Sequence, residues 1–202
     1  SMLPATMHLQ VAQLCLEQDA HFVSSSYVSP EMAELDQKAK DKGLCFVNEV
    51  GLDPGIDHLM AHILVDQYRQ SEQYSASNKL YFRSYCGGFP AQANDFKYKF
   101  SWSPLGVLKA LKSPAKWLNE GVESTTNTPW KAVKNYESIV ESGKETFQAY
   151  PNRDSLPFMQ DYQFDADWNV QEFIRGTLRL NGWTTAWKDI FDLVESVKTD
   201  AD

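Results

Sequence analysis

The segment from Asn48 to His58 concentrates four ionisable side chains in a stretch that also holds two glycines and a proline. The apolar run at 44–47 predicts a buried strand, and the apolar residues after the segment recur at helical spacing. The segment is thus predicted to be a strand-to-helix turn. Ligands of open α/β sheets bind beyond the carboxyl ends of strands, where the Asp53 carboxylate would favour a protonated amine.

Two other interpretations of this segment involve Asp53 and the nearby histidines. Asp53 precedes Pro54 in the pattern of a helix N-cap, a role that can coexist with a catalytic one. His58 and His62 are spaced i, i+4, which would let them share a metal. No Glu follows the first histidine and no third ligand is indicated, so we favour the absence of a metal site.

A basic strand is the second candidate for chemistry. Residues 173–183 are apolar or small at even positions, and Arg175, Thr177 and Arg179 stand at odd positions. This alternation predicts a strand with one wet, basic face. Such a face is most often solvated surface, but guanidinium groups also bind carboxylates through two hydrogen bonds. A polar turn at 150–155 would add Arg153, and three arginines in an acidic chain favour anion binding.

The strand predicted at 79–86 ends in Cys86, Gly87 and Gly88. The two glycines permit a sharp turn and a close approach of the backbone to a ligand. Because no histidine partner marks the Cys86 thiol as a nucleophile, the sequence does not predict covalent catalysis.

Helices and strands alternate along the first part of the chain. A helix at 8–18, a strand at 21–23, a helix capped by Ser29 and closed by Gly43, a strand at 44–47 and a helix to about 70 predict parallel strands with helical crossovers. After a boundary near 70–78 the pattern becomes α+β. A helix is predicted at 104–112, a polar irregular stretch at 113–142 and strands at 146–150 and 173–183.

Composition narrows the class of protein. The 202 residues carry a formal net charge of −8 and no Lys/Arg cluster, which argues against a nucleic-acid partner. No apolar run approaches the ~20 residues of a membrane span, and no signal peptide is evident, so a cytoplasmic protein is expected. Three cysteines without C-x-x-C spacing argue against a disulfide framework or a structural zinc site.

The glycine-rich turn of a dinucleotide site is absent from the chain, which has no G-x-G-x-x-G. Ser1 and Met2 precede a sequence that starts partway through a fold. We therefore expect the chain to be a portion of a larger protein.

Six blocks of the sequence, in this order, resemble the saccharopine dehydrogenases of the L-glutamate-forming type, also called saccharopine reductases. They are residues 26–30, 48–58, 84–88, 98–103, 150–155 and 175–179. The resemblance covers most of positions 3 to 183.

The resemblance implies an α/β fold. Residues 1–70 would be the C-terminal part of a Rossmann-like parallel sheet, and 71–202 an α+β substrate-binding and dimerisation domain with a mixed sheet. NAD(P) would be bound mainly by a region outside this chain, and the protein would be a homodimer. The location would be cytoplasmic, or mitochondrial in a bifunctional eukaryotic enzyme.

The resemblance also assigns roles to single residues. The residues implied to contact a substrate with several carboxylates are Ser26, Tyr27, Arg153, Thr177, Leu178 and Arg179. Leu3 and Ser25 match positions beside the coenzyme. Tyr27, Asp53 and Cys86 match residues near the reacting secondary amine, and among them we favour Asp53 for electrostatic stabilisation of that nitrogen.

The implied function is an oxidoreductase of lysine metabolism that interconverts saccharopine with L-glutamate and α-aminoadipate semialdehyde. The chain alone is expected to be inactive. Two alternatives remain: a reductase of the same superfamily resembling carboxynorspermidine synthase, or a non-catalytic module whose sheet pairs with a second copy.

Overall fold

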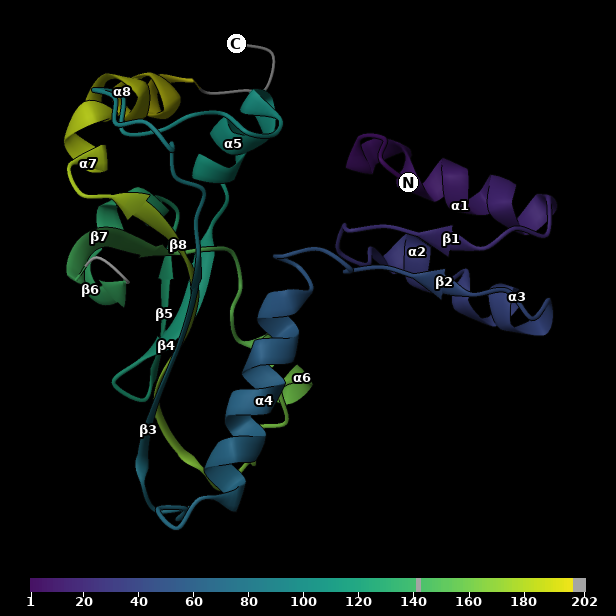
Figure 1. The fold of residues 1–202 in the computed structure, drawn as a ribbon, viewed down its shortest axis with the longest axis horizontal. Helices are drawn as coiled ribbons and strands as arrows, with labels where there is room; N and C mark the ends of the chain where they lie inside the picture. The colour runs from purple at the N-terminus through teal and green to yellow at the C-terminus, as the bar shows by residue number, and fades with distance from the viewer. Residues whose placement is uncertain (141–142, 198–202) are drawn as a thin grey trace. The chain divides into compact units, whose positions relative to one another are not determined.

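The computed structural model describes residues 1–140 and 143–197, and the chain divides into two compact units, Ser1–Gln67 and Tyr68–Asp202 (Figure 1). Each unit has its own sheet and its own hydrophobic core. Within the described residues, no helix has the length and apolar character needed to span a membrane.

The first unit contains a two-stranded parallel sheet with helices around it (Figure 1). Its elements in chain order are η1 (Ala5–Met7), α1 (His8–Glu17), β1 (Phe22–Val23), α2 (Pro30–Ala33), α3 (Asp36–Asp41), β2 (Phe46–Val47) and α4 (Ile56–Gln70). The last residues of α4 belong to the second unit. The parallel pairing of β1 with β2 confirms the predicted α/β alternation.

The core of the first unit collects one apolar face from each of its first three α-helices. Its buried members are Ala12, Leu16, Phe22, Met32, Leu35 and Ala39. The predicted cap is confirmed, because the Ser29 side chain accepts a hydrogen bond from Met32 N, and Gly43 follows α3 with φ +67°.

The single helix predicted between Ser29 and Gly43 is wrong in one respect. The chain breaks into α2 and α3 at Glu34 and Leu35, where Leu35 N bonds to Met32 O in a tighter i to i+3 turn. Met32 and Leu35 are both buried on either side of this turn.

The second unit contains a six-stranded mixed sheet. Its strands are β3 (Lys79–Cys86), β4 (Ala115–Asn119), β5 (Val122–Thr126), β6 (Lys134–Val140), β7 (Gly143–Pro151) and β8 (Asn169–Leu180). The order is β5-β4-β8-β7-β6, with β3 pairing parallel to β8 and the other pairs antiparallel. This arrangement confirms the predicted mixed sheet.

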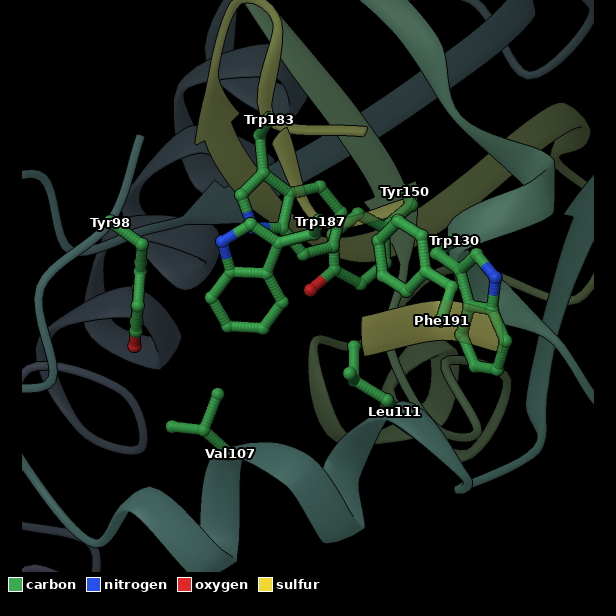
Figure 2. Close-up of a cluster of buried hydrophobic side chains, with 8 residues drawn as sticks. All are labelled: Tyr98, Val107, Leu111, Trp130, Tyr150, Trp183, Trp187 and Phe191. Carbon is green, nitrogen blue, oxygen red and sulfur yellow. The ribbon is translucent and has the colours of Figure 1, made fainter. Parts of the chain in front are cut away.

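Short helices α5 (Pro104–Leu111), α7 (Trp183–Ala186) and α8 (Lys188–Ser196) gather at one end of this sheet, and α6 (Pro157–Asp161) lies elsewhere along the chain (Figure 1). Figure 2 shows Val107 and Leu111 of α5 directed toward a group of aromatic rings. The buried members of this cluster are Tyr98, Val107, Leu111, Trp130, Tyr150, Trp183, Trp187 and Phe191.

Two predictions about the second unit are wrong. Residues 113–140 are not irregular, because β4 and β5 form a hairpin there and β6 follows. The last two residues of the stretch predicted as irregular, 141–142, lie outside the described residues. Glu120 and Gly121 join the hairpin with φ +53° and +75°, as a two-residue turn with positive φ at both positions requires. The strand predicted to reach residue 183 ends at Leu180, and Gly182, with φ +85°, precedes α7.

Candidate active site

The carboxyl ends of β1 and β2 bring two predicted site segments side by side in the first unit. Phe22 and Val23 lie in register with Phe46 and Val47. Backbone hydrogen bonds continue past the strands, from Glu49 N to Ser26 O at 3.1 Å and from Val50 to Ser24 at 3.3 Å. The loop after β1, residues 24–27, and the turn that begins at Asn48 therefore lie together at the strand ends, where open α/β sheets bind ligands.

Tyr27 and Asp53 form a direct contact between these two segments. The Tyr27 hydroxyl donates a hydrogen bond of 2.9 Å to Asp53 Oδ1, and both side chains are exposed. The helix after Asp53 begins at Ile56, whereas an N-cap at Asp53 would require it to begin at Pro54. Asp53 is therefore not the N-cap of α4, and its carboxylate lies beside the Tyr27 phenol.

His58 lies beside this pair and between two other carboxylates. Its Nε2 is 3.5 Å from Glu49 Oε2, its Nδ1 is 3.7 Å from Asp57 Oδ2, and its ring meets that of Tyr27 edge to face at 6.4 Å. The other oxygen of Glu49 accepts a hydrogen bond from Val28 N at 3.0 Å. Glu49 was not predicted as a site residue from the sequence, although it belongs to the segment from Asn48 to His58.

No group of three or more histidine, cysteine, aspartate or glutamate side chains suited to a metal ion is present among the described residues. His58 and His62 belong to no such group there.

Gly55 shapes the turn that carries Asp53. Its φ is +146°, and a Cβ at this position would lie 2.3 Å from Gly51 O and 2.7 Å from Glu49 O. Gly51 N bonds to Pro54 O and Ile56 N bonds to Gly51 O, so the turn folds back on itself before α4 begins. Only glycine fits this position without moving the backbone around Asp53.

Leu3 and Ser25, the predicted coenzyme contacts, are exposed near the carboxyl end of β1. Gly51 lets the turn approach Ser25, since a Cβ on Gly51 would be 3.1 Å from Ser25 Cβ. The Leu3 carbonyl accepts a hydrogen bond from His8 Nε2 at 2.8 Å.

In the second unit, Cys86 at the end of β3 lies beside Thr177 on the parallel strand β8. Their Cα atoms are partners in the β3–β8 register. Gly87 follows in close contact with β8, because a Cβ there would lie 2.4 Å from Leu178 O. Three predicted site residues, Cys86, Thr177 and Leu178, thus meet at one place. The Cys86 thiol is half-buried and not in a disulfide.

Arg179 is buried inside a box of aromatic rings, and the prediction of a wet basic face is wrong. Its side chain is 9% exposed, and its Cζ lies 5.0 Å from the Tyr98 ring centroid, 5.3 Å from Trp183 and 5.7 Å from Tyr150. Figure 2 shows these three aromatic side chains within the cluster. Arg175 on the same face is equally buried and lies over the Phe158 ring at 3.9 Å. Residues distant in sequence cover this face, which a single strand cannot reveal.

The charge of Arg179 is not matched within the described part of the chain. No carboxylate there forms an ion pair with it, and its Nε lacks a hydrogen-bond partner. Its Nη1 donates to Leu178 O at 3.2 Å. A buried guanidinium without a counter-ion is costly, so this position favours an incoming anion.

Tyr150 supports Arg179 from the neighbouring strand. Burial raises the pKa of the Tyr150 phenol, although the Arg179 charge and hydrogen bonds to Thr177 and Arg179 act in the opposite direction. Its ring stacks on Trp183 with centroids 5.3 Å apart and 9° between the planes. The phenol therefore stays neutral and polar beside the guanidinium.

Arg153 is exposed and lies apart from Arg179 along the sheet. It follows the end of β7 with φ +53°, and its carbonyl accepts a hydrogen bond from Lys116 N. Arg179 pairs with Gln148 on β7, which stands five residues before Arg153 in the chain.

Two family profiles match the chain. The saccharopine dehydrogenase C-terminal domain matches residues 51–201, and the saccharopine dehydrogenase NADP-binding domain matches residues 1–47.

Curated relatives and a solved structure give the same result. Saccharopine dehydrogenase [NADP(+), L-glutamate-forming] of Pyricularia oryzae is 41% identical over 197 residues, which is 96% of this chain and 42% of the relative. The mitochondrial alpha-aminoadipic semialdehyde synthase of Mus musculus is 34% identical, over 92% of this chain and 20% of the relative. The structure of apo saccharopine dehydrogenase (L-Glu forming) from Saccharomyces cerevisiae superposes with a TM-score of 0.79 at 36% identity, covering all of this chain and 44% of that one. The chain thus spans less than half the length of these relatives.

Proposed function

We propose that this chain, which belongs to the saccharopine dehydrogenase family, carries substrate-facing residues of an NAD(P)-dependent oxidoreductase of lysine metabolism. The reaction is the interconversion of saccharopine, NAD(P)⁺ and water with L-glutamate, α-aminoadipate semialdehyde, NAD(P)H and a proton. The observation that supports it most is the buried Arg179 guanidinium, which has no acidic partner among the described residues.

Arg179 would bind one carboxylate of the substrate. The aromatic box excludes water and fixes the plane of the guanidinium, so a carboxylate can accept two parallel hydrogen bonds from it. Burial strengthens this interaction because the local dielectric constant is low. Arg153 would bind a second carboxylate, and Thr177 and Leu178 of the same unit would contact the same ligand. In the first unit, Ser26 is proposed as a substrate contact.

Tyr27 and Asp53 of the first unit would act at the secondary amine. Oxidation there removes a hydride from carbon and yields an imine, which water then hydrolyses with proton transfers at nitrogen and oxygen. The Asp53 carboxylate would stabilise positive charge on the nitrogen. Tyr27, already bonded to Asp53, would position that carboxylate. In the second unit, the Cys86 thiol is proposed as a weaker hydrogen-bonding group.

The coenzyme supplies the acceptor or donor of the hydride. Leu3 and Ser25 lie near the carboxyl end of β1, the edge of a parallel sheet where nucleotides bind, so the residues present fit a coenzyme at this position. Because the sequence has no glycine-rich phosphate loop, we infer that most coenzyme contacts come from elsewhere in the full-length protein.

We also infer how the chain is divided into functional domains. Residues 1–70 would end the coenzyme domain and residues 71–202 would form the substrate-binding and dimerisation domain. A homodimer is expected for the full-length protein in the cytoplasm, or in mitochondria if it is bifunctional. Light scattering after size exclusion tests the dimer, and a monomer at micromolar concentration would contradict it.

Saccharopine binding to the full-length protein distinguishes this function from that of a polyamine reductase. Arg153→Ala should weaken saccharopine binding about tenfold, since one charge-assisted pair is lost, and should leave the weak binding of carboxynorspermidine unchanged. Calorimetric titration of both ligands measures this. Tighter binding of carboxynorspermidine than of saccharopine by the wild-type protein would refute the proposal.

A further inference from the structure

We propose that His8 is a positioning residue that joins the Leu3 segment to the loop Ser24–Tyr27. The inference rests on the proposed function in one respect: that function assigns Leu3 and Ser25 to the coenzyme and Ser26 and Tyr27 to the substrate. His8 would then hold the coenzyme side and the substrate side of the first unit in one geometry.

His8 uses both ring nitrogens. Its Nε2 lies 2.8 Å from Leu3 O, and its Nδ1 lies 2.9 Å from Ser24 Oγ. A carbonyl oxygen can only accept, so Nε2 carries the hydrogen, and in the neutral ring Nδ1 accepts from the Ser24 hydroxyl. Ser26 N in turn donates to Ser24 Oγ at 3.0 Å. One tautomer therefore satisfies every donor in a continuous path from Ser26 to Leu3.

The hydrogen bonds of this path are costly to break because His8 and Ser24 are buried. His8 is 6% exposed and Ser24 is 2% exposed, and the His8 ring meets Phe22 edge to face at 6.2 Å. Removing the imidazole would leave the buried Ser24 hydroxyl without its acceptor, at a cost larger than that of an exposed hydrogen bond. The Ser24–Tyr27 loop and the Leu3 segment would each lose an anchor.

A histidine can also activate a neighbouring serine as a nucleophile, but the geometry of His8 and Ser24 argues against this role. Nε2 is occupied by the Leu3 carbonyl, and the Ser24 oxygen is buried and already accepts from Ser26 N. A substrate carbonyl has no access to Ser24 Oγ. The pair therefore acts on neighbouring backbone and not on substrate.

Three substitutions of His8 in the full-length protein separate its two hydrogen bonds. His8→Leu removes both, His8→Asn keeps an acceptor near the position of Nδ1, and His8→Gln keeps a donor near that of Nε2. Leu16→Ala is the matched control, because Leu16 is buried on the same helix and in the same core but lies outside the path. The readouts are amide hydrogen exchange at Ser26, the Kd for NADPH, and kcat and KM for saccharopine.

His8→Leu should speed exchange at Ser26 about tenfold and raise the Kd for NADPH about fivefold, the effect of one lost hydrogen bond. The KM for saccharopine should rise more than kcat falls. His8→Asn should restore slow exchange at Ser26, and His8→Gln should restore the Kd for NADPH. Leu16→Ala should lower the midpoint of thermal unfolding without these changes.

The proposal is overturned if His8→Leu matches Leu16→Ala in both Ser26 exchange and NADPH binding, because His8 would then be merely structural. A wild-type protein that binds neither NADPH nor saccharopine would refute the proposed function instead. In that case Ser26 exchange still decides whether His8 holds the loop, since that readout needs no ligand.

Discussion

The hydroxyl of Tyr27 donates a 2.9 Å hydrogen bond to Oδ1 of Asp53, joining two segments that are 26 residues apart in sequence. The phenol follows β1 and the carboxylate follows β2, so parallel pairing of two short strands is enough to bring them together. The contact unites a proton donor with an anion at the strand ends. In the proposed function, the Asp53 carboxylate would stabilise positive charge on a substrate amine.

Loss of this hydrogen bond should reduce catalysis without reducing stability. Tyr27→Phe in the full-length protein should lower kcat/KM for saccharopine roughly 10- to 100-fold, because the Asp53 carboxylate loses its orientation. The free energy of unfolding should change by less than about 0.5 kcal/mol, since both groups are exposed. Steady-state kinetics and urea denaturation measure the two effects.

A double-mutant cycle tests whether Tyr27 acts through Asp53. If it does, Tyr27→Phe should add little to the loss caused by Asp53→Asn. Fully additive losses in kcat/KM would show that the two side chains act independently, against the role given to their hydrogen bond.

The carboxylate-binding role of Arg179 predicts a specific failure on replacement by lysine. Arg179→Lys keeps the charge but loses the planar fork, so the KM for saccharopine should rise roughly 10- to 100-fold. Arg83→Lys is the control, because Arg83 lies on the other face of the sheet and pairs with Glu172 Oε2 at 2.5 Å. Equal effects of the two substitutions would contradict a specific role for Arg179.

The turn that carries Asp53 should not tolerate a side chain at Gly55. Gly55→Ala forces a Cβ to 2.3 Å from Gly51 O, so the free energy of unfolding should fall by about 3 kcal/mol. Gly43→Ala isolates the backbone cost, because Gly43 also has positive φ but an added Cβ would meet nothing within 4 Å. That variant should lose only about 1 kcal/mol. Urea denaturation of both variants checks the difference, and losses of the same size would contradict the steric argument.

Alkaline pH should weaken the second unit through Tyr85. Burial raises the pKa of Tyr85 to about 12, from 10.0 for an unperturbed phenol. The unfolded state therefore releases this proton first, and the contribution of Tyr85 to stability is complete below pH 10 and is lost as the pH rises to about 12. Denaturation from pH 9 to 12 should show a shallower decline for Tyr85→Phe than for the wild type. Parallel declines would be inconsistent with the raised pKa.

Local signals were sufficient for several elements. The strand 79–86 has alternating side chains and a double glycine at its end, and the structure places β3 at those residues. Ser29, Pro30 and Gly43 mark helix ends through their own backbone and side-chain chemistry. These features depend on neighbours within a few residues, so the sequence is enough to predict them.

Features that depend on distant residues escaped prediction. The hairpin of β4 and β5 is mostly polar, and β4 joins the sheet by pairing with β8, a distant partner that the hairpin's own sequence does not indicate. Arg179 looked solvent-exposed because Tyr98 and Tyr150, which cover it, come from other segments. His8 stood outside every motif, and its partner Ser24 lies 16 residues away. Tertiary contacts decide each of these cases.

The most direct test of the proposed function is NADPH formation from saccharopine and NADP⁺ by the full-length protein. We expect turnover that requires both substrates, falls strongly in Arg179→Lys and is retained in Arg83→Lys. Residues 1–202 alone should show no turnover, as the coenzyme contacts would be incomplete. A folded full-length protein that fails to reduce NADP⁺ with saccharopine would refute the proposed function.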